Sequence, residues 1–225
     1  MGGADPPGQI PSKGEAKLVT IPVHEKRFRV ASARPVTDYT RYWVVPIARA
    51  AVAFAAAMLI ALTTHHHAQF GLVVFGTFAV LEGLIVGVVT WFTLTDKVVR
   101  SYFMAQGALG VVAGILALSL SSSGLGLFLY LVSVWALLTG AIELYCGVRT
   151  RKTGPASRDW MTMGGMTIIL SIVFVLIPSD ETLSIGIYGA YAAILGVYLG
   201  IGAFSLKWGM QHGKADAPNL ESKNS

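Results

Sequence analysis

The sequence predicts an all-α integral membrane protein whose six transmembrane helices form three tandem helical hairpins, with both termini in the cytoplasm. Three observations predict this fold: long apolar runs, an internal repeat of helical hairpins, and basic residues confined to alternate loops. Of the 225 residues, 54% are hydrophobic and only 13% are charged. Soluble domains have about 25% charged residues, so the composition favours a membrane protein.

The central hairpin gives the clearest signal for membrane-spanning helices. Two apolar runs, about Val98–Leu120 and Leu125–Val148, are separated only by the short linker Ser121–Gly124. Each run exceeds the roughly 20 residues that a helix needs to cross a hydrocarbon core about 30 Å thick. Because the linker is so short, the two helices are expected to run antiparallel.

This hairpin recurs on both sides of itself. Gly83, Gly140 and Gly196 stand at equivalent points of three apolar runs, and the interval from Gly83 to Gly140 equals that from Gly107 to Gly164. We call this interval the repeat spacing. Self-similarity at a fixed period indicates tandem structural repeats. The other four helices are expected at about Val44–Thr63, Phe70–Thr93, Trp160–Ile177 and Leu183–Leu206.

The distribution of basic residues predicts the topology. All 17 Lys and Arg residues lie in the N-terminal arm, at the start of the first helix, in two alternate loops, or in the C-terminal tail. The loops at His65–Gln69, Ser121–Gly124 and Pro178–Thr182 have none. Since cytoplasmic loops are enriched in Lys and Arg, both termini are expected on the cytoplasmic side of the membrane. We expect that membrane to be a bacterial inner membrane. The net charge of +5 therefore reflects topology, and nucleic acid is not an expected partner.

Three regions follow from these patterns. Residues 1–40 are expected to form a cytoplasmic basic arm that is partly extended, residues 41–208 the six-helix transmembrane domain, and residues 209–225 a cytoplasmic polar tail. In the arm, Pro22 and Pro35 disfavour a continuous helix.

Two interpretations of the arm stay open. It is either a basic segment held near anionic lipid headgroups or an extended strand that becomes ordered on a partner protein. The residues expected to contact a partner are Ile21, Val23, Arg27, Phe28, Arg29 and Val30.

Four polar residues lie inside apolar runs: Arg49, Glu82, Gln106 and Glu143. A charge at the bilayer centre costs about 2.5–3.5 kcal/mol on insertion scales, so each charged residue should have a partner. Arg49 and Glu143 lie at similar depth near the cytoplasmic ends of their helices, and we predict an ion pair between them, with Gln106 as a nearby donor. Glu82 lies near the middle of its helix, where no basic residue matches its depth. We expect it to be protonated, hydrogen-bonded across the bundle, or paired with another protein.

Glycines four positions apart indicate close helix packing. The pairs are Gly83/Gly87, Gly110/Gly114 and Gly196/Gly200. Such pairs let helix backbones approach closely in a membrane. We expect them to pack the bundle itself, and a homo-oligomer formed through the same faces is the alternative.

No motif for catalysis, a cofactor or a metal site is found in the sequence, so we do not expect an enzyme. The single cysteine excludes an intrachain disulfide. His65, His66 and His67 are adjacent, but consecutive residues do not project to one face and no carboxylate is next to them. We interpret these histidines as a polar turn.

The hairpins are similar to those of the HdeD-type acid-resistance membrane proteins, over about Thr40–Trp208. Aromatic residues begin the odd helices, with Tyr102 and Phe103 before GALGVVAGILAL and Trp160 before MGGMTIILSIVFVLIPS. The even helices carry central glycines, in WALLTGAIEL and YAAILGVYLGIGAF. This resemblance implies six helices in three hairpins, no catalytic residues, and a stand-alone role in acid stress.

The arm, PVHEKRFRVASARPVTDYTRYWVVPIARA, resembles that of conserved actinobacterial membrane proteins. One member of that group is an accessory subunit of Mce-type lipid importers. The resemblance implies a non-catalytic subunit of a larger inner-membrane complex, an ABC-type lipid importer of the cell envelope, which is the function we expect first. The alternatives are the stand-alone stress protein and a small proton-coupled transporter that uses Glu82.

Overall fold

The computed structural model describes residues 2–3, 44–64, 67–94, 96–152 and 156–221. The helices are α2 (Val44–Leu62), α3 (Ala68–Thr93), α4 (Lys97–Ser119), α5 (Leu125–Arg149), α6 (Ala156–Leu176) and α7 (Glu181–Glu221), with a short 3₁₀ helix η1 (Ser121–Ser123) between α4 and α5. All six α-helices contain a segment long and apolar enough to cross a membrane. The prediction of an all-α, six-helix membrane protein is therefore confirmed for the part of the chain that the structure describes.

The N-terminal arm lies outside the described residues, apart from Gly2 and Gly3. The arm residues expected to contact a partner therefore stay predictions; they are Ile21, Val23, Arg27, Phe28, Arg29 and Val30. His65 and His66 also lie outside the described residues.

Short acidic residues begin two of the helices. The Asp96 carboxylate accepts hydrogen bonds from the backbone N–H groups of Val98 at 2.8 Å and Val99 at 3.3 Å. Asp180 does the same for Leu183, at 2.7 Å. A carboxylate in this position satisfies N–H groups that the first helical turn leaves without partners.

One predicted boundary is wrong. The end of the apolar run predicts that the last helix ends near Leu206, but α7 continues to Glu221. The physical reason is that Leu206 marks the end of the apolar segment only. The apolar, membrane-spanning part of α7 does end close to the prediction, at Ser205, and the helix then continues through Gly209, Gly213 and Pro218.

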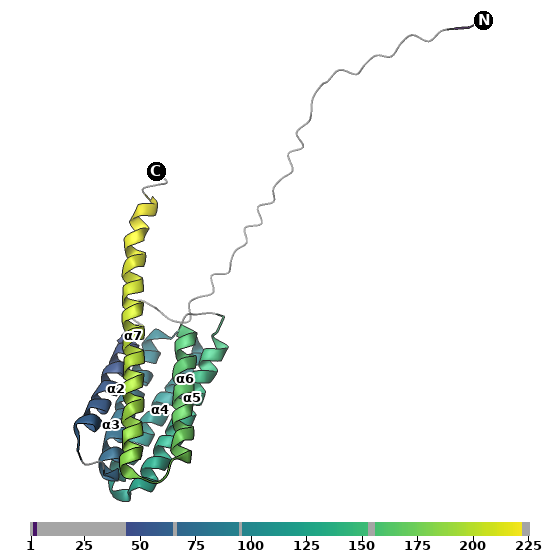
Figure 1. Ribbon diagram of the computed structural model, residues 1–225. Coiled ribbons are helices and arrows are strands. Elements are labelled where there is room, and N and C mark those ends of the chain that lie inside the picture. Colours follow the sequence, from purple (N-terminus) through teal and green to yellow (C-terminus); the bar gives the residue numbers. More distant parts are fainter. Residues whose placement is uncertain (1, 4–43, 65–66, 95, 153–155, 222–225) are drawn as a thin grey trace. The chain divides into compact units, whose positions relative to one another are not determined.

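The tightest helix contacts join different hairpins. Along the chain the hairpins follow one another as predicted, but α3 packs most closely on α4, α5 on α6, and α7 on α2 (Figure 1). Helices within one hairpin contact each other less extensively. Glycine alone indicates a close contact and does not say which neighbour makes it, so the sequence pattern does not predict this pairing.

Glycines form the α3–α4 contact. A Cβ atom added at Gly83 would lie 2.5 Å from the carbonyl oxygen of Gly107, and one at Gly114 would lie 2.5 Å from that of Gly76. These distances are too short for any side chain, so the backbones touch directly. In contrast, a Cβ at Gly87 would have no other atom within 4 Å. The Gly87 backbone nevertheless lies close to α4, since a Cβ at Gly107 would lie 3.0 Å from the Gly87 Cα atom. The prediction that Gly83/Gly87 allows close backbone approach is thus confirmed, although only Gly83 has no room for a side chain.

Glycine also lies in the other two contacts. A Cβ at Gly164 of α6 would lie 2.6 Å from the backbone nitrogen of Leu144 in α5. On α7, a Cβ at Gly196 would lie 3.2 Å from the ring of Phe54 in α2, whereas at Gly200 the nearest atom of that ring is 3.9 Å away. The α7–α2 contact is therefore formed by glycine against a large side chain rather than by glycine against glycine.

These three contacts close the bundle into a ring. The second helix of each hairpin packs on the first helix of the next, and α7 of the last hairpin packs on α2 of the first. Gly83, Gly140 and Gly196, which are equivalent in the sequence repeat, each face the following hairpin in this way. The repeat therefore has a counterpart in space, with approximately threefold cyclic packing.

An aromatic cluster fills the middle of the ring. It consists of Phe75 and Phe78 from α3, Phe128 and Trp135 from α5, and Tyr188 from α7. The ring of Phe75 lies 5.6 Å from that of Trp135 and 5.8 Å from that of Tyr188, each pair close to perpendicular. Edge-to-face packing of this kind is a favoured geometry for buried aromatic rings.

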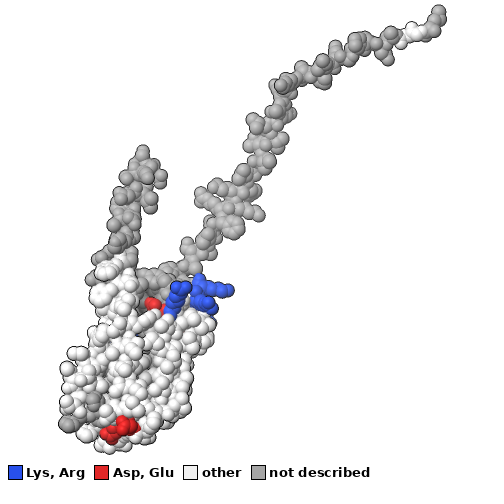
Figure 2. Space-filling view, in the orientation of Figure 1, with Lys and Arg blue, Asp and Glu red and all other residues white. Residues whose placement is uncertain are grey.

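The two ends of the bundle differ in charge (Figure 2). Lys and Arg residues gather near the α3–α4 and α5–α6 turns; they are Lys97, Arg100, Arg149, Arg151, Lys152 and Arg158. We call this the basic end. Asp180 and Glu181, at the start of α7, lie at the opposite end.

Candidate functional site

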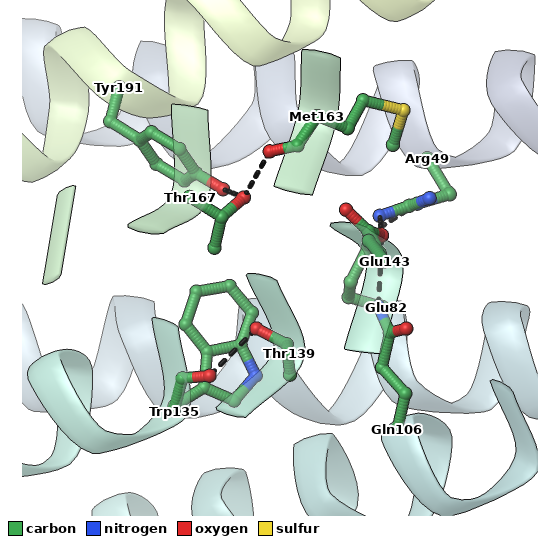
Figure 3. A network of polar contacts seen from close by, with 9 residues as sticks. All are labelled: Arg49, Glu82, Gln106, Trp135, Thr139, Glu143, Met163, Thr167 and Tyr191. Atoms are coloured by element: carbon green, nitrogen blue, oxygen red, sulfur yellow. Dashed lines mark hydrogen bonds and ion pairs between the residues drawn. The ribbon is translucent and has the colours of Figure 1, made fainter. Parts of the chain in front are cut away.

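The four polar residues predicted inside apolar runs meet in the bundle core (Figure 3). Arg49 comes from α2, Glu82 from α3, Gln106 from α4 and Glu143 from α5. Each is buried, with between 2% and 8% of its surface exposed. We call these four residues the polar cluster.

Arg49 joins the two carboxylates. Its Nε donates to Oε1 of Glu82 at 2.5 Å, and its Nη2 donates to Oε1 of Glu143 at 2.8 Å. The same Glu143 oxygen accepts another hydrogen bond, from Nε2 of Gln106 at 2.9 Å. Charged groups in a membrane core require this kind of pairing, because an isolated charge there is costly.

The predicted contact between Arg49 and Glu143, with Gln106 as a donor, is present. The expectation that no basic residue matches the depth of Glu82 is wrong, since Arg49 pairs with it. That expectation measures the depth of each residue from the basic end of the bundle, but α2 and α3 do not end at the same level there. The turn that joins them is the better reference. Arg49 precedes the end of α2 at Leu62 by nearly the same interval that separates Glu82 from the start of α3 at Ala68. The two residues are therefore level.

The repeat explains why three members of the polar cluster, Arg49, Glu82 and Gln106, lie at one level. Arg49, Gln106 and Met163 follow one another at the repeat spacing, so they occupy the same position in the first helix of successive hairpins. Glu82 and Thr139 are separated by the same interval, in the second helices. The ring thus brings equivalent positions to one level of the core, and in this chain most of those positions are polar.

Further polar side chains at this level were missed by sequence reasoning. The hydroxyl groups of Thr167 and Tyr191 are 2.9 Å apart, and the Thr139 hydroxyl donates to the backbone oxygen of Trp135 at 2.7 Å. Figure 3 shows these residues beside the polar cluster. Threonine in an apolar helix is inconspicuous, and only the repeat spacing from Glu82 could have drawn attention to Thr139.

A small cavity of about 10 Å³ lies at the centre of the cluster. Arg49, Glu82, Gln106 and Glu143 line it together with Thr139, Thr167, Trp135 and Tyr191, among others. A cavity needs roughly 10–15 Å³ to hold one water molecule, so this one is at the lower limit.

Three buried oxygens have no hydrogen-bond partner among the described residues. They are Oε2 of Glu82, Oε1 of Gln106 and the hydroxyl of Tyr188. The first two belong to residues that line the central cavity. Most buried polar atoms in proteins are hydrogen-bonded, so a pair of unpartnered oxygens at one small cavity needs an explanation.

Metal-ligating residues do not cluster in the described part of the chain, where no group of three or more His, Cys, Asp or Glu residues could hold a metal ion. His67 of the predicted polar turn has Nδ1 3.8 Å from Oε2 of Glu181, at the start of α7. The carboxylate that the sequence lacks beside the histidines is therefore supplied by another hairpin. Cys146 is buried and free.

An apolar groove lies on the outside of the bundle between α2 and α3. Its volume is about 490 Å³. The groove opens because α2 packs mainly on α7 and α3 mainly on α4, which leaves the first hairpin loosely packed. Its lining residues are Ala51, Val52, Ala55, Ala56, Leu59, Phe70, Val73, Val74, Thr77, Phe78 and Leu81.

Fold and site together define a multi-pass helical membrane protein with a buried ionic core. A comparison with protein-family models gives no match for this chain, and comparisons with curated proteins and with solved structures give none either.

Proposed function

We propose that this chain is a non-catalytic accessory subunit of a larger inner-membrane complex. The observation that carries the proposal is the apolar groove between α2 and α3. Arg49, Glu82 and Glu143 pair with one another inside the bundle, and the groove offers a partner within the membrane a mainly apolar surface. Such a surface suits binding and stabilisation of other transmembrane helices.

The groove has the chemistry of a helix-packing site. Ala51 and Ala55 on α2 are small and exposed, which allows close approach of another backbone. Thr77 on α3 donates its hydroxyl hydrogen to the carbonyl oxygen of Val73 at 2.8 Å. Its polar atom is therefore satisfied within its own helix, and no lining residue demands a polar partner in the lipid phase.

The arm supports the same function from the sequence. It leads directly into α2, the helix that lines one side of the groove, and it combines basic and apolar residues suited to a protein partner. Its resemblance to the arm of an accessory subunit implies that the complex is an Mce-type lipid importer of the cell envelope.

Purification from native membranes tests the proposal. Ala51→Trp fills the groove and should lower the recovery of partner subunits at least several-fold. Ala108→Trp is the matched control, because Ala108 occupies the same position one repeat later and is exposed on α4. It should leave recovery unchanged, and Phe28→Ala in the arm should lower it.

Equal recovery with Ala51→Trp and Ala108→Trp would count against the groove as the binding surface. Recovery of this chain alone, in multiple copies, would instead support the stand-alone homo-oligomer.

A further inference from the structure

The polar cluster carries an unbalanced charge if every group in it is ionised. One guanidinium, from Arg49, faces two carboxylates, from Glu82 and Glu143. The sum is one negative charge in a part of the protein surrounded by apolar helices. Among the described residues, Tyr188 and Tyr191 of α7 and Cys146 of α5 are further titratable groups near Glu82 and Glu143, and none of them supplies a positive charge. A single bound proton would neutralise the cluster.

The two carboxylates are not equivalent as proton acceptors. Oε1 of Glu143 accepts two hydrogen bonds, from Arg49 and Gln106, which stabilise its ionised form. Glu82 accepts one, from Arg49, and its second oxygen has no partner among the described residues. The proton therefore belongs on Glu82.

The neighbouring amide supports the same assignment. Gln106 donates its N–H to Glu143, which leaves Oε1 of Gln106 buried as an acceptor without a donor among the described residues. Glu82 and Gln106 line the same cavity. Two hydrogen-bond acceptors in one small cavity need a donor. A proton on one of them supplies that donor, and the hydrogen bond to the other forms directly or through one water molecule.

We propose that Glu82 is a proton-binding site, and that it holds one proton on Oε2 while Arg49 and Glu143 remain an ion pair. Proton uptake converts the Glu82 carboxylate to a carboxylic acid, with the proton taken from solvent and no other bond made or broken. The ligand class is a proton alone, and the site is independent of the accessory function proposed above.

Two further small cavities lie next to this site. Arg49 lines the central cavity and also two neighbouring ones, of about 30 Å³ and 20 Å³. The larger neighbour reaches Asp159 and Tyr198, whose hydroxyl donates to the Asp159 carboxylate at 3.2 Å. Toward the other end, the aromatic cluster fills the core, with Phe75 and Phe128 fully buried. Because small cavities lie on the side of Asp159 and packed aromatic rings on the other side, we expect protons to exchange with solvent at the basic end.

Infrared spectroscopy of the full chain in lipid nanodiscs tests the site. At neutral pH the wild type should show the C=O stretch of a protonated carboxyl group that shifts in D₂O. Glu82→Gln should abolish this band. Asp159→Asn, which removes the half-buried carboxyl that the neighbouring cavity reaches, should retain it. A wild type without the band, or a band that survives Glu82→Gln, overturns the proposal.

A second variant covers the case in which Glu82→Gln does not fold. Glu143→Gln leaves one carboxylate facing Arg49, so the cluster becomes neutral without a proton and the band should disappear. Its persistence would overturn the proposal as well.

The route has its own test. Gly202 lines the cavity that reaches Asp159, and a Cβ there would have no atom within 4 Å. Gly202→Leu should slow the D₂O shift of the band several-fold. Gly186→Leu, at the other end of the same transmembrane segment and equally free of contacts, should not. An unchanged rate in Gly202→Leu would contradict exchange through the basic end.

Discussion

Arg49 donates hydrogen bonds to carboxylates from two different helices, and so it ties α2 to both α3 and α5. Removing one partner of a buried ion pair leaves the other charge uncompensated, which costs more than the pair itself contributes. The stability of the bundle should therefore depend on Arg49 more than on either carboxylate alone.

Arg49→Ala should lower the free energy of unfolding by about 3–5 kcal/mol, the usual cost of breaking a buried ion pair. Adding Glu143→Ala to this variant should restore part of the loss, because one stranded carboxylate is removed. Unfolding in mixed micelles measures both values. Strictly additive losses for the two substitutions would mean that the pair does not couple them.

Part of this site was predictable from the sequence. Polar residues inside apolar runs need partners, and this rule identifies all four members of the cluster. It leaves Glu82 without a basic partner when helix depth is counted from one end, although the turn between α2 and α3 is the better reference. The unpartnered oxygens and the cavity depend on side-chain geometry, which no sequence pattern contains.

At the scale of helices, close packing rests on particular glycines rather than on every glycine of a motif. Gly83 and Gly87 lie one helical turn apart on α3, and the backbones of both lie close to α4, yet an added Cβ would clash with α4 only at Gly83. Whether a side chain fits at a glycine depends on the direction in which its Cβ would point relative to the neighbouring helix. The four-residue spacing alone does not determine that direction.

Gly83→Ala should therefore destabilise the bundle, because its Cβ would lie 2.5 Å from a backbone oxygen that cannot rotate away. Overpacking of a core usually costs about 1–3 kcal/mol. Gly87→Ala is the control and should leave stability unchanged or slightly higher, since alanine favours helix. Thermal unfolding in detergent compares the two. Equal losses would show that the loss at Gly83 does not come from a clash of the added Cβ with α4.

The whole fold was largely predictable, and its pairing was not. Apolar length predicts six helices, and the repeat predicts three equivalent hairpins. Which helices pack most tightly depends on matching faces of glycine and large side chains, such as Gly196 against Phe54. Closure of α7 on α2 joins residues far apart in the sequence, and local patterns cannot indicate it.

The charge difference between the ends predicts the topology of the molecule in its membrane. In a variant with Cys146 replaced by Ala, a cysteine at Lys152 at the basic end should be labelled only from the cytoplasmic side. A cysteine at Ser122, in the opposite turn, should be labelled only from outside. Both positions are exposed. Labelling of both from the same side would contradict the arrangement of hairpins across the bilayer.

Native mass spectrometry of the tagged chain, purified gently from its own membranes, shows whether this chain works inside a larger membrane complex. We expect a species whose mass exceeds that of the 23.9 kDa chain by that of different, stoichiometric subunits. A species with the mass of one chain, or of a whole-number multiple of it, would rule out the proposed complex.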